Sequence, residues 1–192
     1  AADVGPRGDG YEVPADAIDV SAAIDYHAPQ IEALAHAEVD AICALTMTNV
    51  NEAIGIALAA RRHGLPIIVS PTVETDGRLP GGLELAQFIE RVDEMTGGAP
   101  AFYMVNCAHP QHIAKVLASA ARNEQRWLGR LRGFRANASC KSHAELDEAT
   151  SLDRGDPLDL AQRIAALQKT YDWRVVGGCC GTTPAHLKAI AE

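Results

Sequence analysis

The stretch WRVVGGCCGTTPAH, residues 173–186, combines a short apolar strand, a glycine-rich turn and the start of a helix. Its first residues have the β-branched and aromatic character of a strand, and Thr183 before Pro184 is typical of a helix N-terminus. Cys179 and Cys180 stand between glycines at the point where this strand ends. The stretch is therefore one strand–helix unit that carries two adjacent cysteines in its turn.

Similar units repeat along the rest of the chain. Apolar runs alternate with amphipathic stretches, and further strands are expected at residues 39–45, 65–70, 101–107 and 131–137. Helices are expected at residues 21–37, 50–63, 83–95, 143–149 and 157–171, and another begins at Pro110. This alternation is typical of an α/β protein with a parallel sheet.

The chain shows no linker, low-complexity tract or change of composition, so the simple interpretation is a single domain over residues 1–192. A doubly wound sheet and a (β/α)8 barrel both fit the repeated units. No Gly-x-Gly-x-x-Gly fingerprint or phosphate loop follows a strand, which weakens the nucleotide-binding alternative.

Composition excludes several classes of protein. Of the 192 residues, 47% are hydrophobic and 22% are charged, which is ordinary for a soluble globular protein. The 17 basic residues form no cluster and are outnumbered by 25 acidic ones, so nucleic-acid binding is not expected. No apolar run approaches the roughly 18 residues that span a membrane. An odd number of cysteines, five, without a secretory signal favours a cytoplasmic protein.

Polar and reactive residues collect at the carboxyl ends of the five expected strands. In chain order these are Thr46, Ser70, Asn106 with Cys107, Asn137, and Cys179 with Cys180. In a parallel α/β protein this is the edge where ligands bind. The alternative is that any strand becomes polar where it leaves the core.

The cysteines make the sharper case for a site. Neighbours in a regular strand point to opposite faces, so Cys179 and Cys180 can face one ion only where the flanking glycines free the backbone. Cys107 ends a strand two units earlier, and three thiolates with one open position suit a catalytic zinc. A vicinal disulfide, or two small residues packed by glycine, are the alternatives. Cys43 is expected in the core, and Cys140 is expected to be a bystander in the polar insertion.

The histidines and the loop acids are less informative. His109 and His112 follow Cys107, where a zinc ligand or proton-transfer group could sit, but a helix start with solvent-facing rings is the favoured interpretation. Glu74 and Asp76 are expected in a solvated loop. The remaining histidines are expected on helix surfaces or caps: His27, His36, His63, His143 and His186.

Two motifs carry a family resemblance. Val105-Asn106-Cys107 upstream of Pro110, together with residues 177–186, resembles the zinc motifs of the homocysteine S-methyltransferase family. That family includes betaine- and S-methylmethionine-dependent enzymes and the homocysteine domain of cobalamin-dependent methionine synthase. Residues 70–81 resemble the segment after the family's fifth barrel strand, and Asn137 resembles the Asn that ends its seventh. The resemblance covers nearly the whole chain, but only the later part of the family's barrel.

The resemblance implies a fold and an activity. The fold is an α/β (β/α)8 TIM barrel, here from the end of strand 3 through helix 8, and residues 1–5 resemble the end of that third strand. Zn²⁺ would be held by Cys107, Cys179 and Cys180, with the substrate thiol in the open position. The activity is transfer of a methyl group from S-methylmethionine, betaine or a similar donor to homocysteine, which gives methionine. A barrel typically needs about 250 residues, so the 192-residue chain alone is not expected to close the site.

The resemblance also bears on substrate binding. The residues expected to bind substrate are Thr46, Ser70, Asn106 and Asn137, and no catalytic residue is expected beyond the zinc site. The expected partners are a small-molecule thiol acceptor and a methyl donor, and a homo-oligomer is left open.

Many family members have Glu-Thr where this chain has Leu45-Thr46, and that Glu is linked to the amino group of homocysteine. The acceptor therefore either binds differently or is another thiol. A zinc- or thiol-binding module without catalysis is an alternative, as is redox chemistry of a Cys179–Cys180 disulfide.

Overall fold

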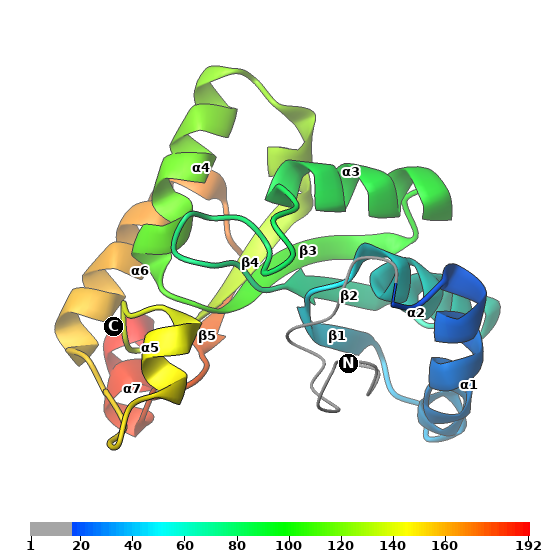
Figure 1. Cartoon of the computed structure of the whole chain (residues 1–192), viewed down its shortest axis with the longest axis horizontal. Coiled ribbons are helices and arrows are strands. Elements are labelled where there is room, and N and C mark those ends of the chain that lie inside the picture. Colours follow the sequence, from blue (N-terminus) through cyan, green and yellow to red (C-terminus); the bar gives the residue numbers. More distant parts are fainter. Residues whose placement is uncertain (1–16) are drawn as a thin grey trace. The chain divides into compact units, whose positions relative to one another are not determined.

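A computed structural model describes residues 17–192, and the strand end expected at residues 1–5 lies outside them. Within the described residues, five strands alternate with helices and follow one another in the sheet order β1-β2-β3-β4-β5 (Figure 1). The chain divides into two compact units, and it passes between them after Pro71, after Arg78 and within β3 (Pro100–Ala108). The single domain expected from the sequence stays a prediction.

The first unit contains the described residues up to Pro71 together with Leu79–Tyr103. Its sheet is parallel, because β1 pairs with β2 and β2 pairs with the first part of β3. Its elements are α1 (Val20–His36), β1 (Ile42–Met47), α2 (Val50–Arg62), β2 (Ile67–Pro71) and α3 (Leu85–Thr96). The sequence therefore predicts each of these elements to within three residues at either end.

Close packing of α1 against α2 organises this unit. A Cβ atom at Gly55 would overlap Ala23, so glycine lets the two helices approach closely. Asn49 begins α2 by accepting hydrogen bonds from two backbone N–H groups of the first turn. His27, expected on a helix surface, is instead buried, and its Nε2 lies 2.9 Å from Oε1 of the buried Glu52. A buried ion pair or hydrogen bond therefore joins the two helices.

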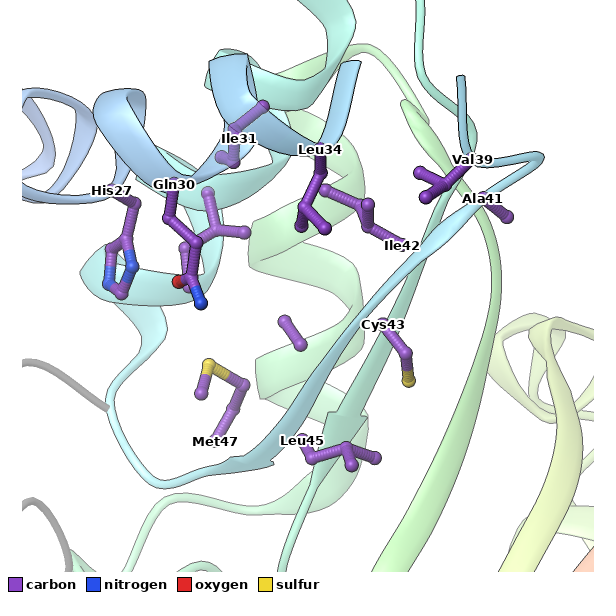
Figure 2. A pocket seen from close by; sticks show the side chains of 12 residues that line it. His27, Gln30, Ile31, Leu34, Val39, Ala41, Ile42, Cys43, Leu45 and Met47 are labelled. Atoms are coloured by element: carbon purple, nitrogen blue, oxygen red, sulfur yellow. The ribbon is translucent and has the colours of Figure 1, made fainter. Parts of the chain in front are cut away.

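Cys43 departs from its expected place in the core, because its side chain is exposed. Alternate residues of a strand point to opposite faces, and Cys43 shares the more exposed face of β1 with Leu45, whereas Ala44 is buried. Figure 2 shows Cys43 and Leu45 lining one side of a pocket, with Leu34 of α1 on the other. An apolar run alone does not reveal which face of a strand is covered.

The second unit contains Thr72–Arg78 together with Met104–Glu192. Its sheet consists of the end of β3 beside β4, with β4 and β5 paired in parallel. After β3 come α4 (Pro110–Arg122), a short 3-10 helix (Arg126–Arg130), β4 (Leu131–Ala136), α5 (His143–Asp147), α6 (Pro157–Tyr171), β5 (Val175–Gly178) and α7 (Pro184–Ala191). The sequence predicts all of these except the 3-10 helix.

Aromatic stacking and tight strand pairing hold the second unit together. The rings of Phe134 and Trp173 stack with centroids 5.1 Å apart and planes within 5° of parallel. A Cβ atom at Gly133 would lie 2.8 Å from the carbonyl oxygen of Val175, so glycine is required where β4 meets β5. Among residues 17–192, no helix has the length and apolar character needed to cross a membrane.

Candidate metal centre

Three cysteine sulfurs meet at the carboxyl ends of β3 and β5. The Sγ atom of Cys107 lies 3.1 Å from Sγ of Cys179 and 3.4 Å from Sγ of Cys180. All three sulfurs lie within 4.8 Å of one another, in a geometry that could hold a metal ion. Cys107 and Cys179 are half-buried and Cys180 is exposed, so the cluster is open to solvent on one side. The predicted grouping of these three residues is thus present in the structure.

The end of β4 holds the two adjacent cysteines in place. The backbone N–H of Cys179 donates to the carbonyl of Ala136 at 2.7 Å, which continues the β4–β5 pairing by one residue. The carbonyl of Cys180 accepts from the backbone N–H of Ala138 at 3.0 Å. Both cysteines are therefore fixed against the same neighbouring segment, although they follow the last residue of β5.

Glycines permit the turn that carries Cys179 and Cys180. Gly181 has a φ of 77°, and a Cβ atom there would lie 2.8 Å from the carbonyl oxygen of Asp153. A Cβ atom at Gly178 would overlap the side chain of Thr182, whose hydroxyl donates to the carbonyl of Cys179 at 2.7 Å. The expectation that flanking glycines let both sulfurs turn toward one point agrees with this geometry.

Two buried asparagines support the cysteines. Asn137 donates from Nδ2 to the carbonyl of Cys107 at 3.0 Å and accepts at Oδ1 from the backbone N–H of Cys180 at 3.1 Å. Asn106 places its Nδ2 atom 3.9 Å from Sγ of Cys179. Both residues are therefore part of the cluster's surroundings, and their role in binding substrate stays a prediction.

The sulfurs influence each other's ionisation. A hydrogen bond from the Cys107 thiol lowers the pKa of Cys179 to about 5, with the amide of Asn106 also contributing and burial opposing the shift. The same hydrogen bond, together with burial, raises the pKa of Cys107. The two thiols therefore act as a pair that readily loses one proton and holds the second. A cluster with one favoured thiolate is suited to metal binding, since the thiolate is the ligand form of cysteine.

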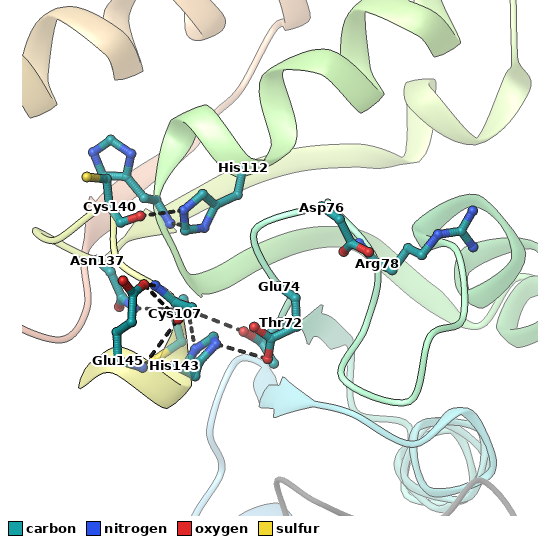
Figure 3. A network of polar contacts seen from close by, with 12 residues as sticks. Thr72, Glu74, Asp76, Arg78, Cys107, His112, Asn137, Cys140, His143 and Glu145 are labelled. Atoms are coloured by element: carbon teal, nitrogen blue, oxygen red, sulfur yellow. Dashed lines mark hydrogen bonds and ion pairs between the residues drawn. The ribbon is translucent and has the colours of Figure 1, made fainter. Parts of the chain in front are cut away.

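Two residues near the cluster differ from their sequence expectations. His143, expected on a helix surface, places Nε2 2.9 Å from the carbonyl oxygen of Cys107. Glu74, expected in a solvated loop, has Oε1 3.3 Å from Nδ1 of His143, as Figure 3 shows. The sequence carries one local signal for this arrangement, a Ser142–Glu145 capping box that makes His143 the first residue of a helix.

His109 and His112 are buried, not solvent-facing as expected. His109 is the N-cap of α4, and Nδ1 of His112 accepts from the backbone N–H of His109 at 3.4 Å. Nε2 of His112 lies 2.9 Å from the carbonyl oxygen of Cys140. Burial, with the neighbouring His112 and Arg163 charges, lowers the pKa of His109 to about 4. Both rings therefore cap the N-terminus of α4, and neither is a member of the cluster of three cysteines.

The other residues considered in the sequence are not members of the cysteine cluster. Thr46 and Ser70 belong to the first unit, at the ends of β1 and β2, and their binding of substrate stays a prediction. Thr46 has a φ of 57°, an uncommon conformation for a residue with a side chain. Cys140 is exposed and is not one of the three clustered cysteines.

Curated relatives match this chain over part of their length. The methionine synthase of Mycobacterium tuberculosis (strain ATCC 25618 / H37Rv) is 29% identical over 140 residues, which is 69% of this chain and 10% of that protein. The methionine synthase of Mycobacterium leprae (strain TN) gives the same identity and coverage. The chain thus spans about a tenth of these relatives.

Solved structures match the fold. The metallated form of the homocysteine methyltransferase MmuM from Escherichia coli has a TM-score of 0.64 at 19% identity, covering 90% of this chain and 51% of that chain. The apo form of MmuM has a TM-score of 0.65 at 21% identity, covering 91% of this chain and 57% of that chain. The five strands and their helices therefore match part of the MmuM structure.

A family model supplies the assignment. The model described as homocysteine S-methyltransferase matches residues 1–192. Since that match extends over the whole sequence, the chain belongs to the homocysteine S-methyltransferase family.

Proposed function

We propose that this chain is part of a zinc-dependent S-methyltransferase that moves a methyl group from an activated donor to a metal-bound thiol. The acceptor is homocysteine, which becomes methionine, and the donor is S-methylmethionine, betaine or a similar compound. The five strands are part of a (β/α)8 barrel in this proposal. The observation that carries it is the cluster of Cys107, Cys179 and Cys180 at the carboxyl ends of two strands.

The donor set fits zinc. Zinc takes thiolate ligands at about 2.3 Å in a tetrahedral arrangement, so neighbouring sulfurs lie about 3.8 Å apart. The observed separations from Cys107, 3.1 and 3.4 Å, therefore need to widen by less than 1 Å. Three protein ligands leave a fourth position for a substrate, which is typical of a catalytic zinc site. The soft sulfur ligands also argue against magnesium and calcium, which prefer oxygen.

The three cysteines would activate the acceptor thiol by holding the zinc ion to which that thiol binds. Bound zinc would hold the acceptor thiol as a thiolate at neutral pH, although a free thiol has a pKa of about 8.5. Three cysteine thiolates give the centre an excess of negative charge, which preserves the nucleophilicity of a fourth sulfur. The half-buried Cys107 and Cys179 form the closed side, and the exposed Cys180 marks the side from which an acceptor can approach. The acceptor sulfur would attack the donor's methyl carbon in line as the donor's S–C or N–C bond breaks, and the donor would leave as a neutral thioether or amine.

Leu45 favours a second candidate function. Its side chain is 37% exposed and cannot pair with an ammonium group, whereas many family members carry Glu at this place. A zinc- and thiol-binding protein without methyl transfer, or one with a different thiol acceptor, would not need that carboxylate. The two candidates share the metal centre and differ in the fate of the bound thiol.

Metal analysis and a methyl-transfer assay on the same protein samples test the proposal. Reduced protein should hold about one zinc per chain, and the complete enzyme that contains this chain should convert homocysteine to methionine with at least one of the two donors. Cys179→Ser should lose both zinc and transfer, and Cys140→Ser is the matched control, since that thiol lies outside the cluster. Zinc binding without transfer to any thiol would favour the second candidate. Undiminished transfer by zinc-free Cys179→Ser would contradict the metal mechanism.

A further inference from the structure

We propose that His143, oriented by Glu74, is a positioning residue that fixes Cys107 for metal binding. The inference rests on the proposed metal centre and adds two residues to it. Neither residue is part of the cysteine cluster, and each acts through the backbone of one cysteine.

The backbone of Cys107 needs external support. Its φ is 56°, which lies in the left-handed region that residues with a Cβ atom rarely adopt. This conformation interrupts β3 next to its last residue and turns the Cys107 side chain out of the regular alternation. Strained conformations of this kind persist only where the surroundings hold them.

Three donors converge on the carbonyl oxygen of Cys107. Nε2 of His143 lies at 2.9 Å, Nδ2 of Asn137 at 3.0 Å and Oγ1 of Thr72 at 3.3 Å. They come from α5, from the end of β4 and from the segment Thr72–Arg78, as seen in Figure 3. A carbonyl oxygen has two lone pairs, so three donors occupy it fully. Together they fix the peptide plane after Cys107 and hence the direction of its sulfur.

Glu74 sets the orientation of the His143 ring. Its Oε1 atom lies 3.3 Å from Nδ1, and both side chains are less than one-third exposed. Glu74 is itself held in a tight turn, because its N–H donates to Arg78 at 2.7 Å and its carbonyl accepts from Gly77 at 2.9 Å. An acid–histidine–ligand chain of this type orients metal ligands in many proteins, and the last link here is the ligand's backbone.

The short helix α5 has no fully buried residue. It has five residues, all of them exposed or half-buried, so hydrophobic burial contributes little to its placement. A Ser142–Glu145 capping box defines its first turn, with Ser142 N–H donating to Glu145 at 2.8 Å. The contacts of His143 with Cys107 and Glu74 therefore tie this helix to the metal centre.

Zinc affinity of the reduced full chain, measured by competition with a chromophoric chelator, tests this role. His143→Ala should bind zinc about 10- to 100-fold more weakly, which is the usual effect of losing an outer-shell partner. His143→Gln should restore affinity to within about threefold, because its amide can donate to the same carbonyl. Glu74→Gln should lie between these two variants. The control His36→Ala removes an exposed histidine at the end of α1 and should bind zinc as the wild type does.

Cobalt spectra separate positioning from a general structural role. The visible absorption of the Co²⁺-loaded protein should change in His143→Ala and remain unchanged in His143→Gln, while the metal-free variants melt within a few degrees of the wild type. Equal zinc affinity of His143→Ala and the wild type would overturn the inference, and so would equal losses in the Ala and Gln variants.

These measurements use neither methyl donor nor acceptor. If the wild type binds zinc but transfers no methyl group, the proposed function fails and the affinities of the His143 variants still decide this inference. If the wild type transfers methyl groups and His143→Ala binds zinc normally, only the positioning role fails. The two proposals are therefore distinguishable.

Discussion

Oδ1 of Asn137 accepts a hydrogen bond from the backbone N–H of Cys180 at 3.1 Å. The same side chain donates to the carbonyl of Cys107 at 3.0 Å, so one amide joins the two segments that carry the three sulfurs. Asn137 is buried, which makes both hydrogen bonds costly to lose. This bridge joins the backbone of Cys107 to that of Cys180, although the sulfurs of Cys107 and Cys179 that meet in the cluster come from residues 72 apart in sequence.

Replacing this bridge should weaken both fold and metal binding. Asn137→Ala removes a buried side chain and leaves the N–H of Cys180 and the carbonyl of Cys107 with one partner fewer each, so urea unfolding should show a loss of about 2 kcal/mol. Zinc affinity should fall as well, since the side-chain bridge between the two cysteine segments is lost while backbone hydrogen bonds remain to hold them. Asn123→Ala, at the exposed C-terminal end of α4, is the matched control. A bridge variant with wild-type stability and affinity would show that the backbone alone holds the cysteines.

Cys179 should be the most reactive thiol of the metal-free protein at mildly acidic pH. Its pKa of about 5 means that it is largely thiolate at pH 6, where an ordinary thiol with a pKa of about 8.5 is protonated. Labelling with iodoacetamide, followed by mass spectrometry, should give a rate for Cys179 that rises through pH 5 and levels off by pH 7. Asn106→Ala should move this midpoint upward, because it removes a donor to the sulfur. Labelling of Cys179 that begins only above pH 8 would contradict the shared-proton pair.

The buried His109 should make the protein less stable in acid. Its pKa is lowered to about 4, so the unfolded state takes up the proton first as the pH falls below about 6.5. Stability from this residue is therefore complete above pH 6.5 and is lost as the pH falls to 4, by up to about 3 kcal/mol. His109→Asn keeps an N-cap on α4 and removes the titrating group. Denaturant unfolding at pH 7 and pH 5 should show a smaller loss in this variant than in the wild type.

Gly181 should not tolerate a side chain. Its φ is 77°, and a Cβ atom would lie 2.8 Å from the carbonyl oxygen of Asp153, so alanine would be strained as well as crowded. Gly181→Ala should cost about 1–3 kcal/mol of stability and reduce zinc affinity, because the turn also carries Cys179 and Cys180. Gly129→Ala is the control, since no atom lies within 4 Å of its Cβ position. Equal behaviour of the two variants in thermal unfolding and zinc titration would contradict this account of the turn.

The sequence predicts the helices and strands well because the residues that begin and end each element lie next to it in the sequence. Each strand is an apolar run bounded by turn residues, and capping residues mark the helices. The start of β1 is misplaced by three residues, since the N–H of Val39 still bonds to the carbonyl of Leu34 at the end of α1. Residues with high strand propensity can still belong to the turn that ends the preceding helix, so propensity alone does not show where the strand begins.

The surroundings of the cysteines are less predictable for a physical reason. Asn137, Cys179 and Cys180 stand beside glycine or at strand ends, so sequence alone points to them. His143 and Cys107 are 36 residues apart, and their contact depends on how a five-residue helix folds back. The burial of His109 and His112 likewise comes from tertiary packing, which no local pattern encodes.

All three clustered cysteines, with Asn137, His143 and Glu74, belong to one of the two compact units. Leu45, which stands where the family resemblance predicts Glu, belongs to the other. Under the proposed function, the residues that would hold the metal and the position expected to contact the amino group of the acceptor therefore belong to different compact units. A substitution at Leu45 therefore leaves every residue of the cysteine cluster and its supporting hydrogen bonds unchanged.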